Sequence, residues 1–282
     1  MKKPNVKPVN IKKVNSNDIK EFPDVLAVEE PLEIRICFTK NGEPQEKNIS
    51  VTMRTPGNDL ELAMGFLFTE GIIFSEADVD KVWHCETVEK EEEYGNVVKV
   101  NLRTGLELDI SKLERHFYTS SSCGVCGKSS IESVSQNCSV LPDSSFKIKR
   151  NIISKLPLLL EDDQTIFKHT GGIHASALFG ANGELKLMRE DVGRHNALDK
   201  IAGAALFSHR LPLSQNILLV SGRASFELVQ KTLMLGIPVL CAVGAPSSLA
   251  YDLAKENNMT LVGFIKKEGF NIYCGEERIS PL

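Results

Sequence analysis

The segment LLVSGRASFELVQK, residues 218–231, determines the fold class that the sequence predicts. Its first residues form a short apolar run of the kind that makes a buried strand, and a helical pattern begins at Ser225. Small and polar residues at 221–224 separate the two patterns. A strand that leads directly into a helix is the repeating unit of an α/β sheet.

The same alternation of strand and helix patterns extends over the second half of the chain. It predicts an α/β layer with a largely parallel sheet. The predicted strands are Ala175–Phe179, Leu185–Met188, Asn216–Val220, Val239–Val243 and Leu261–Ile265. The predicted helices are Ile152–Leu160, Asn196–Phe207, Ser225–Leu235 and Ser247–Glu256.

The first half of the chain has a pattern typical of β-structure. Apolar residues alternate over 32–38 and over 49–53, with the turn sequence NGEP between them, and this predicts a hairpin with one buried face. Residues 98–102 and 106–110 alternate in the same way around a Thr-Gly turn and predict a second hairpin.

One helix is predicted between the two hairpins. In TPGNDLELAMGFLFTEGII, Asn58 or Asp59 caps the helix and Gly71 ends it. We therefore expect three regions. They are an N-terminal β-rich α+β domain over 1–118, a Cys-x-x-Cys loop and linker over 119–145, and an α/β domain over 146–282.

The composition is that of an ordinary globular protein, with 42% hydrophobic and 25% charged residues. A net charge of −4 gives no overall basic field, so we expect no nucleic-acid partner. No segment has the apolar pattern of a signal peptide, and the most apolar stretch, LMLGIPVLCAVGAP, is interrupted by Gly236 and Pro238. We therefore expect a cytoplasmic protein that has no membrane partner.

Three strand-to-helix joints in the second half are rich in glycine and small polar residues: 189–200, 218–231 and 243–254. Ligands of open α/β sheets collect where strands end and helices begin, and helix N-termini offer free N–H groups to anions. The candidate residues for a phosphate-bearing ligand are Gly193, Arg194, His195, Ser221, Gly222, Arg223, Ser225, Gly244, Ala245 and Ser247.

A plainer interpretation of these joints stays open. Ser225 and Ser247 would then only cap helices, and the two arginines would pair with Glu190 or Asp191. His195, at a helix start, would either transfer a proton or form a structural hydrogen bond.

The stretch HTGGIHASAL contains His169 and His174 on either side of a double glycine. A single histidine of this kind is most often a hydrogen-bonded structural residue. The glycines before an apolar strand indicate a close approach of backbone to a ligand or to another segment.

The chain has seven cysteines, and five of them stand alone in sequence, so reduced thiols are expected rather than a disulfide scaffold. The other two, Cys123 and Cys126, form a pair in YTSSSCGVCGKSS. A structural zinc site needs four ligands, so a zinc ion would have to recruit distant residues such as His84, His169 or His174.

Three further roles are open for the cysteine pair. A thioredoxin-type pair would open a helix, but glycine follows each cysteine here. A purely structural role on a Ser/Gly-rich loop is the second alternative. The third, which the residues favour, is a reactive thiol, because Lys128 and the hydroxyls of Ser120–Ser122 would stabilise a thiolate. We assign no resident metal ion.

Taken together, these motifs resemble the FdhD/NarQ family, the formate dehydrogenase accessory sulfurtransferases. The resemblance covers roughly residues 50 to 279 in order. It is carried by TMRTPGNDLELAMGFLFTEGII, SSCGVCGK, TGGIHASALF, REDVGRHNALDKIAG, LLVSGRASFELVQK, GAPSSLAYDLA and LVGFIKKEGFNIYCGEERI.

The resemblance implies a cytoplasmic sulfur carrier. Such a protein takes sulfur from a cysteine desulfurase as a cysteine persulfide and passes it to the molybdenum or tungsten bis(molybdopterin guanine dinucleotide) cofactor of a formate dehydrogenase. The persulfide-carrying position falls on Cys123, with Cys126 as its partner. An alternative is a chaperone that binds the cofactor without transferring sulfur.

The resemblance also implies further features of fold and site. The fold is a three-layer cytidine-deaminase-like domain with a smaller β-rich domain, and a homodimer is favoured. Guanosine diphosphate should mimic one end of the cofactor. The zinc signature of true deaminases is not intact here, which argues against deamination. The C-terminal cofactor-binding segment falls on Phe264, Ile265, Lys266, Lys267, Glu268, Gly269 and Phe270.

Overall fold

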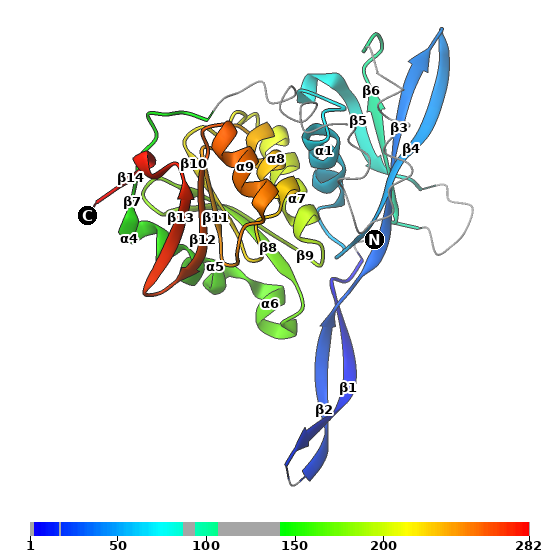
Figure 1. Cartoon of the computed structure of the whole chain (residues 1–282). Coiled ribbons are helices and arrows are strands. Elements are labelled where there is room, and N and C mark those ends of the chain that lie inside the picture. The colour runs from blue at the N-terminus through cyan, green and yellow to red at the C-terminus, as the bar shows by residue number, and fades with distance from the viewer. Residues whose placement is uncertain (1–2, 17, 87–93, 107–141, 282) are drawn as a thin grey trace.

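The computed structural model describes residues 3–16, 18–86, 94–106 and 142–281. Its largest element is a six-stranded sheet with the strand order β13-β12-β11-β10-β8-β9 (Figure 1). All five strands predicted for this half are present, together with one more, β13. The strands are β8 (His174–Gly180), β9 (Leu185–Asp191), β10 (Asn216–Val220), β11 (Val239–Ala242), β12 (Thr260–Lys266) and β13 (Gly269–Cys274).

The prediction of a largely parallel sheet is wrong. The neighbours β10, β11 and β12 run parallel, because the helices α8 (Phe226–Met234) and α9 (Ser248–Glu256) join them as crossovers. The strands β8, β9 and β13 pair antiparallel with their neighbours. Short turns connect β8 to β9 and β12 to β13, and a short turn permits only antiparallel pairing.

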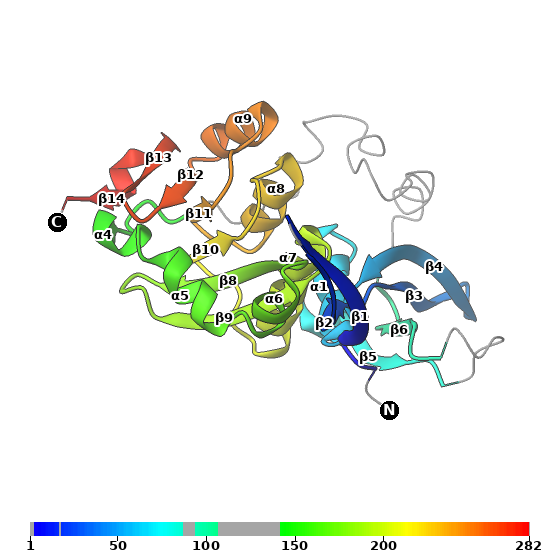
Figure 2. The same cartoon turned by 90° about the horizontal axis from the view of Figure 1, so that it is seen from below.

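Helices lie on both faces of this sheet (Figures 1 and 2). One face packs against α7 (Arg194–Phe207), α8 and α9, and the other against α4 (Arg150–Ile153) and α5 (Leu156–Asp163). Each face of the sheet has its own hydrophobic cluster. The first cluster includes residues of α7, α8 and α9, and the second includes residues of α4 and α5. Successive residues of β10 point into different clusters, Leu218 into the first and Leu219 into the second. The chain therefore has a mixed α/β fold.

The predicted helix over 152–160 is wrong as a single element. The structure has α4 and α5 instead, and Pro157 lies in the first turn of α5. Proline is favoured at a helix start and disfavours continuation of a preceding helix, so it separates the two. The short helix α6 (Thr165–Thr170) follows. Other short elements are β7 (Ile148–Lys149), β14 (Ile279–Ser280), and the 3-10 turns η1 (Glu76–Asp78) and η3 (Glu276–Arg278).

A second sheet of four strands, in the order β4-β3-β6-β5, forms the N-terminal part. The first predicted hairpin is confirmed as an antiparallel pair of β3 and β4. Of the second predicted hairpin, β6 is present, but its return strand lies outside the described residues except for Leu106. The strands are β3 (Glu30–Lys40), β4 (Glu43–Arg54), β5 (Val79–His84) and β6 (Val97–Leu102).

The expectation that β4 has one buried face is wrong, because a β-bulge interrupts the strand. The register shifts opposite Ile34, so that Ile49 has no direct partner on β3. Ile49 is buried, whereas the side chains of Val51 and Met53 are exposed. An extra residue in one strand moves the following side chains to the other face, which explains this result.

The predicted helix before Gly71 is confirmed as α1 (Asp59–Thr69), with Asn58 at the N-cap. Gly71 has a φ of 71°, and its N–H donates to Phe68 O at 2.9 Å. A glycine in the left-handed region after the last turn is a common helix ending.

Two glycines allow α1 and α7 to approach closely. A Cβ on Gly65 of α1 would overlap the carbonyl oxygen of Asp199, and a Cβ on Gly203 of α7 would overlap the carbonyl oxygen of Glu61. The α1 helix thus links the N-terminal sheet to the helical layer of the large sheet, and one hydrophobic cluster extends through both.

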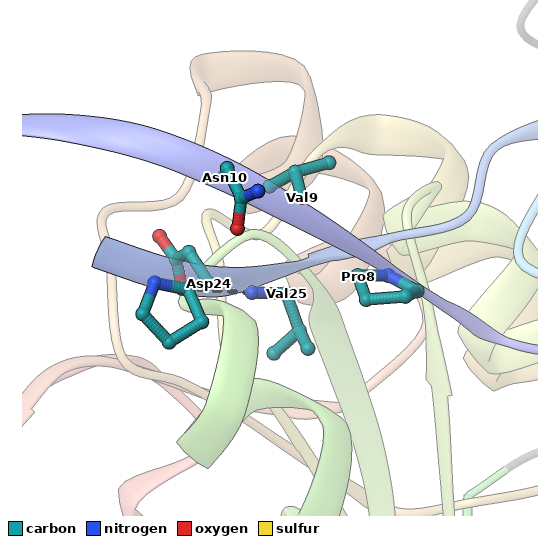
Figure 3. A pocket seen from close by; sticks show the side chains of 6 residues that line it. Pro8, Val9, Asn10, Asp24 and Val25 are labelled. Atoms are coloured by element: carbon teal, nitrogen blue, oxygen red, sulfur yellow. Dashed lines mark hydrogen bonds between the residues drawn. The ribbon is translucent and has the colours of Figure 1, made fainter. Parts of the chain in front are cut away.

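The chain also forms a long antiparallel ribbon that the sequence analysis did not predict. It consists of β1 (Val6–Asn15) and β2 (Asp18–Ala27), and it projects away from the two sheets (Figure 1). Residues from both strands line a shallow hollow (Figure 3). These residues are Pro8, Val9, Asn10, Pro23, Asp24 and Val25.

Candidate functional site

The three predicted joints lie together at one edge of the large sheet. The parallel strands β10 and β11 end there, and β8, which is antiparallel to β10, begins there. Backbone hydrogen bonds connect the joints: Gly244 N–H donates to Gly222 O at 3.0 Å, and Ser247 N–H donates to Ala224 O at 3.0 Å. The start of β8 is joined as well, since Ser221 N–H donates to Ala175 O.

The joint before α7 is built around the buried carboxylate of Asp191. Its Oδ1 accepts hydrogen bonds from Gly193 N–H at 2.8 Å and from Asn196 Nδ2 at 3.0 Å. Its Oδ2 accepts from Thr55 N–H and lies 2.7 Å from the buried Lys200 Nζ. A residue of the N-terminal part therefore helps to hold this joint in place.

The first turns of α7 and α8 meet through His195. Its Nε2 lies 2.9 Å from Glu227 Oε2 and 3.2 Å from Ser225 Oγ. The hydrogen bond from His195 lowers the pKa of Glu227 below its ordinary value, although burial opposes this shift. An ionised carboxylate therefore faces the imidazole.

His174 occupies the beginning of β8, beside the joint after β10. Ser221 Oγ accepts a hydrogen bond from Ala175 N–H at 2.9 Å and lies 3.5 Å from His174 Nδ1. Burial, the nearby Arg194 and His195 lower the pKa of His174. A neutral imidazole at neutral pH follows. A Cβ on Gly222 would lie 3.4 Å from this ring, which shows how closely the backbone passes.

The plainer interpretation of the joints is wrong for both arginines. The carboxylate of Glu190 accepts hydrogen bonds from the N–H groups of Ile166 and Phe167, and Asp191 pairs with Lys200. Within the part of the chain that the structure describes, neither Arg194 nor Arg223 forms a hydrogen bond or an ion pair. The Nε atom of Arg194 is buried and has no hydrogen-bond partner among the described residues.

The plainer interpretation of the serines is correct for one of them. Ser247 Oγ accepts a hydrogen bond from Ala250 N–H and caps α9. Ser225 stands at the N-cap of α8, but its side chain makes no capping bond and instead contacts His195. Two guanidinium groups without a partner in the described part of the chain, together with three helix starts at the same edge, are suited to bind an anion.

The predicted C-terminal segment, 264–270, is divided between this edge and a hairpin tip. Phe264 has a φ of 53°, its side chain is exposed, and its N–H donates to Gly244 O at 3.1 Å. Ile265 is buried in the second hydrophobic cluster, so its side chain faces away from any ligand. Lys267 and Glu268 form the turn between β12 and β13, Lys266 ends β12, and Gly269 and Phe270 begin β13, beside a shallow hollow. Its lining residues are Phe264, Lys266, Glu268, Gly269, Phe270 and Asn271.

Several predicted residues lie elsewhere. Cys123, Cys126 and Lys128 lie outside the described residues. His84 belongs to the N-terminal sheet, where its Nε2 lies 3.9 Å from Asp59 Oδ2. His169 lies on α6. Among the residues that the structure describes, no three His, Cys, Asp or Glu side chains cluster so as to hold a metal ion, and no helix could cross a membrane.

Glu227 and Asp191 are the residues of this candidate site that sequence reasoning missed or misassigned. Acidic residues are common in the first turn of a helix, which hides the pairing of Glu227 with a histidine on another helix. The plainer interpretation offers Asp191 or Glu190 as the partner of an arginine, whereas the partners of Asp191 come from the N-terminal part and from α7.

Comparison with known proteins identifies relatives over nearly the whole chain. The sulfur carrier protein FdhD of Streptomyces avermitilis is 47% identical over 272 residues, which cover 95% of this chain and 93% of the relative. The protein of that name from Mycolicibacterium paratuberculosis is 50% identical and covers 91% and 92% of the two chains. The one from Saccharolobus solfataricus is 39% identical and covers 97% and 98%.

A solved structure from Desulfotalea psychrophila, described as that of a candidate formate dehydrogenase accessory protein, has a similar fold. The TM-score is 0.72, and the match covers 98% of this chain and 100% of the other at 23% identity. The sequence profile of the FdhD/NarQ family matches residues 27–280. On this evidence, the chain belongs to the FdhD/NarQ family.

Proposed function

We propose that this protein carries sulfur as a persulfide on Cys123, from a cysteine desulfurase to the molybdenum or tungsten bis(molybdopterin guanine dinucleotide) cofactor of a formate dehydrogenase. The observation that carries the proposal is the 45–50% identity to curated proteins named sulfur carriers. The Cys-x-x-Cys pair supplies thiols of the type that this chemistry requires.

The first step is a thiol–disulfide type of exchange. The thiolate of Cys123 attacks the terminal sulfur of the donor persulfide, and the S–S bond of the donor breaks. The donor cysteine leaves as a thiolate, and the carrier becomes Cys123–S–SH with no net oxidation. Cys126 then attacks the Cys123 sulfur of the persulfide, so that a Cys123–Cys126 disulfide forms and the outer sulfur leaves at the sulfide level for the metal; a cellular dithiol reductant restores the two thiols.

The cofactor is a substrate here, and its pyrophosphate groups are assigned to the sheet edge. The assignment is supported by Arg194 and Arg223, which have no partner among the residues that the structure describes, and by the starts of α7, α8 and α9. Phe264 and the β12–β13 turn extend the proposed contact surface. We also propose a cytidine-deaminase-like three-layer arrangement for the large domain, a homodimer and a cytoplasmic location.

Mass spectrometry tests the sulfur step directly. The protein is incubated with a cysteine desulfurase and cysteine, and the tryptic peptide that contains Cys123 is weighed. The expected result is a gain of one sulfur atom, and Cys123→Ala should abolish it. Absence of the gain while the desulfurase is active would contradict sulfur transfer.

A second candidate function is a chaperone that binds the cofactor without carrying sulfur. The free arginines favour this function equally, because they concern the anion and not the thiol. One variant distinguishes the two candidate functions. Cys123→Ala should leave formate dehydrogenase inactive if the protein carries sulfur, and should restore full activity if it is only a chaperone.

A further inference from the structure

We propose that an anionic ligand binds at this sheet edge together with a proton that His195 takes up at Nδ1, and that Glu227 is the positioning residue that directs the proton there. The inference rests on the proposed function, because it takes the sheet edge as the place where phosphate groups of the cofactor bind. It adds a proton-linked contact and a second residue that controls it.

The geometry fixes which ring nitrogen carries the first proton. Glu227 Oε2 lies 2.9 Å from Nε2 of His195, and an ionised carboxylate can only accept a hydrogen bond. The Nε2 atom is therefore the donor, and the second contact, Ser225 Oγ at 3.2 Å, lies on the same nitrogen. Nδ1 forms no hydrogen bond with any residue that the structure describes, so it is the atom left for a ligand.

This tautomer makes binding depend on a proton. In the neutral ring, Nδ1 presents a lone pair, which would face the lone pairs of a phosphate oxygen. After protonation, Nδ1–H donates a charge-assisted hydrogen bond to that oxygen. A ligand that prefers one protonation state shifts the protein toward it, so anion binding and proton uptake are linked.

Glu227 also balances the charge that the ring gains. The start of α7 and Arg194, the preceding residue, both add positive charge beside the ring. The carboxylate of Glu227 is held in its ionised form by the hydrogen bond from His195, which lowers its pKa against the effect of burial. The carboxylate of Glu227 therefore offsets the positive charge of the protonated ring, which lies next to Arg194 in the chain.

The other charged groups around the pair do not account for a pH effect near neutrality. His174, on β8, has a pKa lowered by burial and by the nearby Arg194 and His195. Asp191, at the end of β9, is paired with Lys200. Near Glu227, the buried Lys231 has a raised pKa. Burial opposes this shift, but the carboxylates of Asp199 and Glu70 outweigh it.

Calorimetry with guanosine diphosphate tests the proposal. Binding is measured at about pH 6 and about pH 8 for the unmodified protein, His195→Gln and Glu227→Gln. The phosphates of the nucleotide titrate in the same way in each experiment, so the ratio of two proteins' affinities removes that effect. We expect the unmodified protein to bind about tenfold more tightly than His195→Gln at pH 6, and within about twofold at pH 8.

The variant Glu227→Gln examines the positioning role. The amide neither fixes the tautomer nor offsets the positive ring. At pH 6, the affinity of Glu227→Gln for guanosine diphosphate should therefore exceed that of His195→Gln by no more than about threefold. The matched control is His209→Gln, which removes another histidine–carboxylate contact, His209 Nδ1 to Glu76 Oε2 at 2.8 Å, beyond the opposite end of α7. It should bind as the unmodified protein does.

The outcomes separate this inference from the proposed function. Equal affinity ratios at the two pH values, with tight binding of the nucleotide, would overturn the proton-linked contact and leave the cofactor site standing. No binding by the unmodified protein would overturn the cofactor site, and the inference with it. If His195→Gln does not fold, titration of the unmodified protein at about pH 7 in two buffers of different ionisation enthalpy counts the protons, and zero uptake there contradicts the proposal.

Discussion

Lys231 Nζ lies 2.9 Å from Asp199 Oδ1, inside the contact between α8 and α7. Both side chains are almost completely buried, and Lys231 also donates to Thr69 Oγ1 and Glu70 Oε1 at the end of α1. Three helices that begin or end far apart in the chain are thus joined by one ammonium group. The carboxylates keep it charged, because they raise the pKa of Lys231 against the effect of burial.

Replacing Lys231 by methionine should destabilise the protein strongly. The change leaves the carboxylate of Asp199 buried without its counter-charge, and removal of one partner of a buried pair costs about 3–5 kcal/mol. Urea unfolding measures the loss. The second change Asp199→Asn in the same protein should recover part of it, and the exposed Lys255→Met is the matched control.

Adding one methyl group at the crossing of α1 and α7 should also destabilise the fold. In Gly65→Ala the new Cβ would overlap the carbonyl oxygen of Asp199, so the two helices must move apart. Overpacking of this kind costs about 1–3 kcal/mol and sometimes more. Thermal unfolding checks it against Gly269→Ala, where a Cβ would meet no atom within 4 Å. An equal melting temperature of the two variants would contradict the close contact.

His174 should make the protein less stable as the pH falls from about 7.5 to about 5.5. Burial and the nearby Arg194 and His195 lower the pKa of His174 in the folded chain, so the unfolded chain binds the proton first. Protonation therefore favours unfolding once the pH falls below the ordinary histidine value of about 6.5.

The free energy of unfolding at the two pH values measures this effect. The loss on acidification should be smaller in His174→Gln than in the unmodified protein, whereas the exposed His209→Gln should leave it unchanged. An equal loss in all three proteins would show that His174 has no such role.

The sheet edge could be predicted from the sequence because it depends on local patterns. The apolar runs before Ser221 and Gly244 are strands, and the helices begin where glycine and serine predict them. Parallel strands that share crossover helices end at the same edge, so the two joints had to meet. The antiparallel partners were missed, because runs such as 185–188 have the same apolar pattern in either direction.

Long-range pairing accounts for most of what could not be predicted. Lys231 and Asp199 lie on helices, where charged side chains are expected to face solvent, and only the crossing of α1, α7 and α8 buries them. The bulge opposite Ile34 depends on the register of two strands rather than on either sequence alone. The ribbon of β1 and β2 has exposed apolar side chains on both strands, so no buried face marks it.

Removing the guanidinium of Arg223 should weaken nucleotide binding. Arg223 is exposed at the joint after β10 and has no partner among the described residues, so its substitution leaves no orphaned carboxylate behind and should not alter stability. We expect Arg223→Gln to lower the affinity for guanosine diphosphate about tenfold, as loss of a charge-assisted contact does, and to reduce the dependence of binding on salt. Arg210→Gln, an exposed position after α7, is the matched control. An unchanged affinity and salt dependence in Arg223→Gln, with the control unchanged as well, would remove this arginine from the proposed cofactor site.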